Sequence, residues 1–236
     1  MEEHQLPINC FDCKHLTDSV FCALKSEEID LINTHKIIKF YKKGDILFNE
    51  GESVKGLHCL EMGKVKLYKT LEDGNVQILR ISASGELIGY RGLLGNGIYI
   101  ASAEALEDVN VCFIPKLIIH QLLAINANFS LRLMAKFASD LSEAEEKSIF
   151  FVQKSSKERL AEAILMLEST FGVNKDQYIQ LNLTRQELGA YTGLATETII
   201  RALKNWEDLA ILQLNKKKIR VLDREKLKAI SNGNKP

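Results

Sequence analysis

Four of the five cysteines are spaced like the ligands of a single site. Three of them fall within thirteen residues, as Cys10-x2-Cys13-x8-Cys22, and Cys112 follows 90 residues later. In a reducing cytosol, clustered cysteines favour metal binding, catalysis or redox chemistry over structural disulfides. We therefore predict a centre held by the thiolates of Cys10, Cys13, Cys22 and Cys112.

Two other uses of the cysteines have to be considered. Cys59 lies in the strand-like segment Gly56–Met62, which favours a small buried core residue. Cys10 and Cys13 could instead form the dithiol of a redox enzyme, but no thioredoxin-like βαβ unit is predicted around them. No Ser/His/Asp or metal-hydrolase spacing occurs elsewhere. We therefore expect that the chain is not an enzyme.

The segment Leu183–Trp206 has the pattern of two short helices joined by a tight turn. Thr184-x-x-Glu187 is a capping box, which satisfies the free amides at the start of a first helix. Gly193 supplies the turn, and a second helix is predicted from about Thr196. The residues that this second helix buries are Ile199, Leu203 and Trp206. The pattern predicts a helix-turn-helix, in which the second helix enters the major groove of DNA.

The opposite face of the second helix carries side chains that can read bases. Arg201 can donate twice to guanine, Glu197 can accept from cytosine, and Ile200 can touch a thymine methyl group. The alternative is an exposed ion pair between Glu197 and Arg201, worth only about 0.2–0.5 kcal/mol. The residues predicted to face DNA are Thr184, Arg185, Thr196, Glu197, Ile200, Arg201 and Lys204.

Charge is distributed unevenly along the 236 residues. The formal net charge is zero, which argues against a protein that coats nucleic acid without selectivity. Residues 155–236 nevertheless hold 14 Lys and Arg against 10 Asp and Glu, a net charge of +4. A hairpin predicted at residues 212–221 has Lys216, Lys217 and Lys218 at its tip. This composition is typical of a wing that contacts phosphates, and equally of a solvated turn.

The elements that must position these residues indicate an α+β chain. From Lys36 to Pro115, glycine-containing turns recur about every ten residues between β-forming runs, which is typical of an antiparallel barrel or jelly roll. After Pro115 the pattern becomes helical. The predicted parts are a cysteine-rich segment at 1–30, a β-roll sensor domain at 31–116, a long helix at 117–154 and a winged helix-turn-helix at 155–236.

The long helix at 117–154 has an apolar stripe. Its members recur at three- and four-residue steps and are Leu133, Phe137, Leu141 and Ala144. The stripe could pack on the barrel, but a helix of this length has more apolar surface than one barrel flank covers. We predict that it forms the seam of a parallel homodimer. A further helix is predicted to start at Ser155–Ser156 and to end at Gly172.

No apolar run approaches the eighteen or so residues that a membrane crossing needs. The start of the chain, Met1-Glu2-Glu3, is acidic and lacks the basic and apolar regions of a secretory signal. We expect a cytoplasmic protein that makes no membrane contact.

Taken together, the barrel, long helix and winged helix-turn-helix resemble the Crp/Fnr family of bacterial transcription regulators over nearly the whole chain. The stretches that carry the resemblance are Gly85–Gly89, Ala105–Pro115, Lys157–Leu160, Leu183–Gly189 and Thr196–Arg201. The resemblance implies a cyclic-nucleotide-binding-like β-roll, a dimerisation helix and a homodimer on a palindromic operator. The turn Asp73-Gly74-Asn75 resembles a loop of that family that contacts RNA polymerase, and a solvent-exposed hairpin tip explains it equally well.

Within that family the chain is most similar to the oxygen-sensing branch typified by the fumarate-nitrate-reductase regulator. Cyclic-nucleotide binders carry an Arg-Ser or Arg-Thr pair where this chain has Tyr99-Ile100, and the nearby Arg91 is predicted to be a surface turn residue. The oxygen-sensing branch holds a [4Fe-4S] cluster on three N-terminal cysteines and one in a Val-Cys-x-Ile-Pro context. The positions that match are Cys10, Cys13, Cys22 and Cys112.

Alternatives to the cluster remain open, because the gap between Cys13 and Cys22 is longer than in the best-known member of that branch. Zinc could be held by the four thiolates, or by three of them with His15. The chain could also bind no metal, or take a small effector such as a cyclic nucleotide or a haem-bound gas. The resemblance implies a cluster that is labile to oxygen or nitric oxide, promotes dimerisation and directs binding to TTGA half-sites. There Arg201 would meet the guanine and Glu197 the cytosine of the paired strand.

Overall fold

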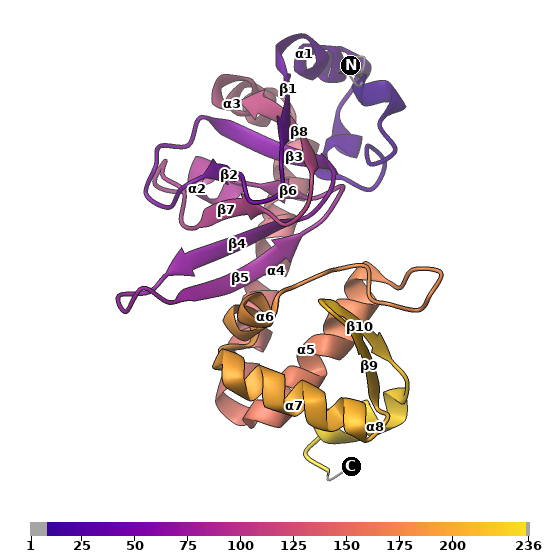
Figure 1. Cartoon of the computed structure of the whole chain (residues 1–236). Helices are drawn as coiled ribbons and strands as arrows, with labels where there is room; N and C mark the ends of the chain where they lie inside the picture. The colour runs from indigo at the N-terminus through magenta and orange to yellow at the C-terminus, as the bar shows by residue number, and fades with distance from the viewer. Residues whose placement is uncertain (1–8, 235–236) are drawn as a thin grey trace. The chain divides into compact units, whose positions relative to one another are not determined.

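A computed structural model describes residues 9–234, apart from the side chains of residues 150 and 151 (Figure 1). The chain divides into two compact units. The first comprises Met1–Lys69 and Leu79–Ser142, and the second comprises Thr70–Ile78 and Glu143–Pro236.

Two antiparallel sheets form the β-roll of the first unit. One has the strand order β1-β8-β3-β6 and the other the order β2-β7-β4-β5. The strands are β1 (Ile37–Tyr41), β2 (Ile46–Phe48), β3 (Gly56–Met62), β4 (Val65–Thr70), β5 (Val76–Ser82), β6 (Leu87–Ile88), β7 (Ser102–Ala105) and β8 (Val109–Pro115). The glycine turns predicted from the sequence join them, and the α+β fold is confirmed.

A short helical segment precedes the barrel. It consists of the 3-10 turns η1 (Cys10–Asp12) and η2 (Val20–Ala23), followed by the helix α1 (Ser26–His35). The side chains of Asn9 and Ser19 cap the two turns by accepting hydrogen bonds from the amides two residues ahead. Phe21 lies in the hydrophobic core, and its ring stacks on that of Phe129. This contact fixes the segment against the barrel.

The sequence pattern predicted one continuous helix after the barrel, and the structure differs from this prediction. A short α2 (Tyr90–Leu94) lies within the barrel, and α3 (Lys116–Ile125) is separated from α4 (Ala127–Gln153) at Asn126. The buried Asn126 side chain explains the break. Its amide nitrogen donates to the Ala23 carbonyl at 3.0 Å and to the Glu28 carboxylate at 2.7 Å, while its oxygen accepts from the Phe129 amide at 2.9 Å.

The apolar residues of α4 divide between two faces. Leu133 is 0% exposed and belongs to the barrel core, whereas Phe137 packs against that core, with its ring against that of Tyr90, and stays partly exposed. The prediction that Leu133 faces a partner is therefore wrong, because the first unit already covers it, and the prediction for Phe137 stays a prediction. Leu141 is 59% exposed, and Ala144 is also exposed.

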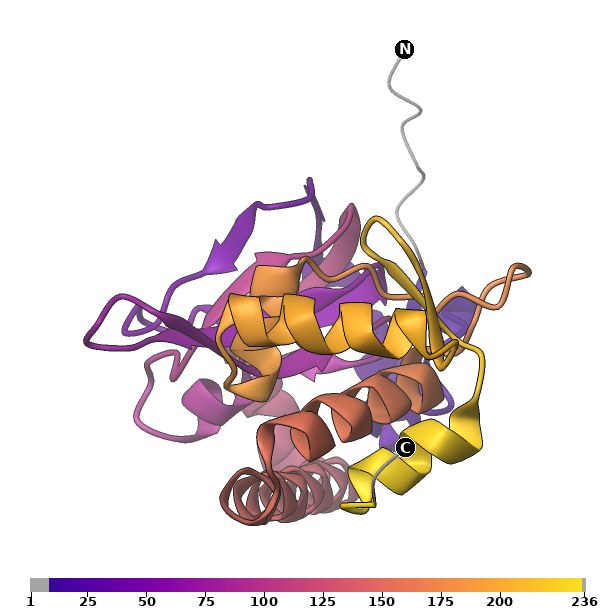
Figure 2. The same cartoon turned by 60° about the horizontal axis from the view of Figure 1, so that its bottom comes forward.

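The second unit has the elements of a winged helix-turn-helix (Figure 2). They are α5 (Ser156–Phe171), α6 (Arg185–Thr192), α7 (Thr196–Asp208), the hairpin β9 (Leu212–Asn215) and β10 (Lys218–Val221), and α8 (Arg224–Ser231). The helix α5 begins after the capping box at Ser155 and ends at Gly172, as the sequence predicted. Trp206 is 1% exposed, and it anchors α7 in the core of this unit.

Within residues 9–234, no individual helix combines the length and apolarity that a membrane crossing requires. The helices α3 and α4, the latter taken to Ile149, meet those criteria only as a pair, and they are bent by 113° at the break.

Candidate functional site

Four thiols line one cavity between the N-terminal segment and the barrel. Cys10 begins the first 3-10 turn and Cys13 caps its C-terminal end, while Cys59 lies on β3 and Cys112 on β8. The cavity measures about 60 Å³, several times the roughly 10–15 Å³ that one water molecule needs. Apolar side chains, including Leu16 and others on α1 and the barrel, form most of the remaining wall. A group larger than one water therefore has room among sulfur ligands.

Polar contacts from α1 hold the first 3-10 turn in place. The amide of Cys10 donates to Asn33 Oδ1 at 2.8 Å, and Asn33 in turn donates to Asn9 Oδ1 at 2.9 Å. The ammonium group of Lys36 donates to Cys10 Sγ at 3.0 Å and to Asn33 Oδ1 at 2.9 Å. These contacts hold Cys10 at the cavity wall, with a cationic group beside its sulfur.

The two barrel cysteines face each other across adjacent strands. Cys59 and Cys112 are paired in the antiparallel register of β3 and β8. Burial, together with the neighbouring Cys112, Cys10 and Cys13, raises the pKa of Cys59. Burial also raises the pKa of Cys112 to about 11, although Lys36 acts in the opposite direction. Without a bound cation these two groups are neutral thiols, and a metal would have to displace their protons.

The other predicted ligands are placed differently. His15 lines the cavity, and its Nε2 lies 3.3 Å from the Glu61 carbonyl oxygen. Cys22 lies on the second 3-10 turn and is not part of the cavity wall. In the described part of the chain, no three His, Cys, Asp or Glu side chains have the geometry of a formed metal site. The donor chemistry fits a thiolate-held group, with three of the four predicted cysteines gathered at one cavity.

Cys59 is the cavity residue that sequence reasoning missed. Strand alternation explained it as a core residue, and the side chain is indeed partly buried against the core. Its position opposite Cys112 follows from the pairing of β3 with β8. That pairing is a long-range contact that no local pattern in either strand specifies.

A second cavity in the barrel is poorly suited to a cyclic phosphate. It also measures about 60 Å³, and its wall includes Phe48, Tyr99 and Ile100. The ring of Tyr99 stacks on that of Phe48 with 3.8 Å between centroids, and burial raises the pKa of Tyr99 to about 12. A neutral aromatic pair thus stands where a phosphate would need a cationic partner.

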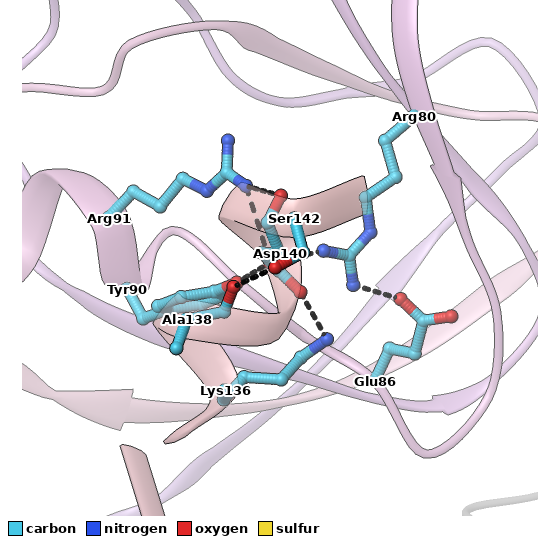
Figure 3. A network of polar contacts seen from close by, with 8 residues as sticks. All are labelled: Arg80, Glu86, Tyr90, Arg91, Lys136, Ala138, Asp140 and Ser142. Carbon is cyan, nitrogen blue, oxygen red and sulfur yellow. Dashed lines mark hydrogen bonds and ion pairs between the residues drawn. The ribbon is translucent and has the colours of Figure 1, made fainter. Parts of the chain in front are cut away.

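The arginines beside this cavity are engaged by one buried carboxylate (Figure 3). The Asp140 side chain, on α4, is 1% exposed and accepts hydrogen bonds from Tyr90 and from Arg80. Arg91 lies 3.4 Å from the same carboxylate, and Lys136 Nζ lies 2.6 Å from its other oxygen. Arg91 is therefore a member of this network and not the surface turn residue that the sequence indicated. We call these five residues the Asp140 network.

Arg80 shows how strongly the Asp140 network is coupled. Burial lowers the pKa of Arg80, but the carboxylates of Glu86 and Asp140 outweigh it and raise the pKa above its usual value. The network joins β5, α2 and α4 of the first unit. It therefore fixes α4 to the barrel at a point beyond the buried Phe129 and Leu133.

In the second unit, local sequence determines the helix-turn-helix. Thr184 Oγ1 accepts from the Glu187 amide at 3.0 Å, and the Thr184 amide donates to Glu187 Oε2 at 2.8 Å, so the predicted capping box starts α6. Gly193 ends α6 with a φ of 66°. A Cβ on Gly189 would lie 2.6 Å from the Leu194 carbonyl oxygen. Glycine at these two positions allows α7 to pack closely behind α6.

The face of α7 that was predicted to read bases is available to solvent. Glu197 and Arg201 are exposed, Thr196 is partly exposed and Ile200 is 52% exposed. Glu197 and Arg201 form no ion pair with each other in the described chain. The exposed ion pair considered as the alternative is therefore not formed.

The remaining predicted DNA-facing residues have partners inside the unit. Lys204 pairs with Glu207 at 3.1 Å and with Asp208 at 3.0 Å on its own helix. The hydroxyl group of Thr184 caps α6. Arg185 donates to the carbonyl of Lys216 at 3.0 Å, which links the start of α6 to the tip of the β9–β10 hairpin. These contacts position the exposed face of α7 and the basic hairpin relative to each other.

Comparison with known proteins agrees with this architecture. Residues 38–126 match the family model for the cyclic nucleotide-binding domain, and residues 158–230 match that for the Crp-like helix-turn-helix domain. The electron transport regulator A of Shewanella oneidensis is 28% identical over 230 residues, which cover 95% of this chain and 90% of that protein. The fumarate and nitrate reduction regulatory protein of Salmonella typhimurium is 29% identical over 227 residues, with coverage of 95% and 90%.

A solved structure gives the same result. FixK2 from Bradyrhizobium japonicum superposes with a TM-score of 0.74 at 25% identity, covering 83% of this chain and 96% of that one. The two domain matches, in the order seen here, account for the β-roll and the winged helix-turn-helix of the two units. The chain is thus a member of the Crp/Fnr family of DNA-binding transcription regulators and is not an enzyme.

Proposed function

We propose that this regulator binds a palindromic operator with TTGA half-sites as a homodimer, and that a thiolate-held iron-sulfur cluster controls the binding. The observation that carries the DNA-binding part is the exposed face of α7, on which Glu197, Ile200 and Arg201 project from a helix anchored by Trp206. Its partners are double-stranded DNA, a second copy of the chain and RNA polymerase, the last through the hairpin turn at Asp73. The protein would act in the cytoplasm, where promoters are accessible.

Each residue of the reading face has a defined role in this proposal. The guanidinium group of Arg201 donates to guanine N7 and O6, and the Glu197 carboxylate accepts from cytosine N4. Ile200 contacts a thymine methyl group and excludes water from the interface. Thr184, Arg185, Thr196 and Lys204, together with the basic hairpin at Lys216, contact the backbone and fix the register of the helix in the groove.

We expect Arg201→Ala to weaken operator binding by about 1–3 kcal/mol, or roughly 5–150-fold, and to relax the preference at one base pair. Fluorescence anisotropy on the operator and on a set of single-base variants measures both effects. Lys217→Ala is the matched control. It should weaken binding about equally on every sequence and reduce the salt dependence by about one phosphate contact. If Arg201→Ala weakens binding equally on all of these DNA sequences, Arg201 does not read a base.

The dimer interface in this proposal is the exposed face of α4. Within the first unit, large apolar side chains at helical spacing remain outside the core, and they are Leu131, Met134 and Leu141. Such a stripe on a helix already fixed to the barrel is suited to pair with its own copy. Two reading helices one DNA turn apart would then contact two half-sites.

We expect Leu141→Glu to weaken dimerisation at least tenfold, or by about 1.4 kcal/mol or more, because each dimer would bury two carboxylates in an apolar seam. Sedimentation velocity over a concentration series measures the change. Ser142→Glu, at the adjacent exposed position, adds the same charge beside the seam and should change the dimer constant by less than about threefold. Equal effects of the two variants would place the interface elsewhere.

The sensing part rests on the thiol-lined cavity. Cys10, Cys13 and Cys112 would hold the group, with Cys22 as the fourth ligand that the family resemblance implies. When bound, a [4Fe-4S] cluster would supply a link that oxygen or nitric oxide destroys. The chain's own residues supply the rest: Lys36 balances charge at Cys10, Asn33 orients the turn, and apolar neighbours limit access of water. Because Cys10 and Cys112 would bind the same group, the chain between them would form a closed loop, and the N-terminal segment would be tied to the barrel.

We expect anaerobically purified protein to be brown and to contain roughly four iron and four sulfide ions per chain, both lost on exposure to air together with most operator affinity. Elemental analysis and anisotropy measure these quantities on one preparation. If the protein contains zinc and no sulfide, the site is a zinc site and not an iron-sulfur cluster. If the protein contains no metal and binds the operator with full affinity, the regulator does not use this sensor. The neutral Phe48–Tyr99 pair and the engaged arginines disfavour a cyclic nucleotide as the signal.

A further inference from the structure

We propose that the fourth thiolate of the site is Cys59 and not Cys22, an assignment that rests on the proposed metal-binding function. Cys59 lines the cavity together with Cys10, Cys13 and Cys112, and Cys22 does not. The ligand set thus consists of two pairs. One pair comes from a single 3-10 turn, and the other comes from two adjacent strands of the barrel.

Backbone geometry explains why each pair reaches the same cavity. The amide of Cys13 donates to the carbonyl of Cys10 at 3.2 Å, so a single turn presents both side chains. Cys59 and Cys112 are direct cross-strand partners, a relation that sets Cβ atoms about 4.5–5.5 Å apart on the same face of a sheet. Four cysteine thiolates are the ordinary ligand set of iron-sulfur clusters and of structural zinc sites.

Cys59 belongs to the cavity wall in the folded chain, and Cys22 does not, although the neighbouring Phe21 lines the cavity. Phe21 is buried, with its ring 5.6 Å from that of Phe129, and the carbonyl of Ala23 accepts a hydrogen bond from the buried Asn126 at 3.0 Å. These contacts hold the residues on either side of Cys22 in the observed arrangement. Cys59 therefore presents its thiol to the cavity without any change in the N-terminal segment.

Matched serine variants test the assignment. Cys10→Ser, Cys22→Ser and Cys59→Ser are each loaded anaerobically with ferrous iron and sulfide, and iron and sulfide per chain are measured together with the visible absorbance. We expect Cys22→Ser to retain the wild-type content and Cys59→Ser to lose at least tenfold, as Cys10→Ser does. Loss of the cluster in Cys22→Ser, or its retention in Cys59→Ser, overturns the assignment.

Two further measurements guard against misfolding of a buried serine variant. Cys59→Ala conserves the apolar character of the position, and circular dichroism of the metal-free protein verifies that the β-roll is intact. In the wild type, the rate of alkylation of Cys22 should be the same within about twofold with and without the bound group, since Cys22 is not a ligand. Protection of Cys22 by more than tenfold on loading overturns the proposal without any variant.

The experiment separates failure of this assignment from failure of the proposed function. If the wild type binds iron and sulfide but the variants reverse the expected order, only the choice of Cys59 fails. If the wild type binds zinc without sulfide, and Cys59→Ser and Cys10→Ser abolish that binding while Cys22→Ser retains it, the thiolate set stands and the iron-sulfur proposal fails. If the wild type binds neither, both fail.

Discussion

Asp140→Ala is expected to lower the free energy of unfolding of the first unit by about 3–5 kcal/mol, and its melting temperature by roughly 6–20 °C. The reason is that the carboxylate is the shared acceptor of the Asp140 network while being 1% exposed. Removing it leaves the Arg80 guanidinium group, the Tyr90 hydroxyl group and Lys136 in low-dielectric surroundings with fewer partners. Burial without a partner costs far more than an exposed ion pair gains.

Thermal and urea unfolding, monitored by the signals of the first unit, measure this loss. Glu143→Ala is the matched control, because Glu143 is an exposed carboxylate on the same helix, and it should change stability by no more than about 0.5 kcal/mol. Asp140→Asn separates charge from shape, since it keeps the size of the side chain and can still accept one hydrogen bond. A loss below about 1 kcal/mol for Asp140→Ala would show that the network contributes little to holding α4.

Trp206→Ala is expected to destabilise the second unit by about 3–5 kcal/mol and to abolish operator binding. Trp206 is among the largest fully buried side chains of the chain and lies on the inner face of α7, in line with Ile199 and Leu203. Its removal leaves a cavity beneath the helix that carries the reading residues. Because Arg201 and Glu197 depend on that helix for their orientation, loss of packing removes binding without touching a base contact.

Ile200→Ala is the matched control for this prediction. Ile200 is on the same helix but is 52% exposed, so its truncation should change stability by less than about 0.5 kcal/mol while altering sequence preference. Urea unfolding and anisotropy on each variant separate the two effects. If Trp206→Ala bound the operator with wild-type affinity, the orientation of α7 would not depend on the core.

The two stability predictions share one structural idea. In the first unit, α4 contributes Leu133 to the barrel core, Asp140 to the network and Leu141 to the exposed stripe. One helix therefore connects the barrel core with the proposed dimer surface. The N-terminal segment contacts the same helix through Phe21, whose ring stacks on Phe129 near the start of α4.

The sequence by itself determined those features that arise from short-range physics. The capping boxes at Thr184 and Ser155, the left-handed glycine at Gly193 and the buried spacing of α7 each depend on residues within one or two turns. The glycine turns of the barrel and the basic hairpin are local in the same sense. For that reason the winged helix-turn-helix and the solvent-exposed face of α7 could be predicted in detail.

Tertiary structure alone decided the features that depend on residues far apart in the chain. The break between α3 and α4 follows from hydrogen bonds of Asn126 to residues about a hundred positions away, and Arg91 is engaged by a carboxylate 49 residues later. The strand pairing that sets Cys59 opposite Cys112 is of the same kind. Helical periodicity gave the apolar residues of α4 but could not say which of them the barrel covers. Periodicity reports which side of an element is apolar, whereas the partner of that side depends on the packing of the whole unit.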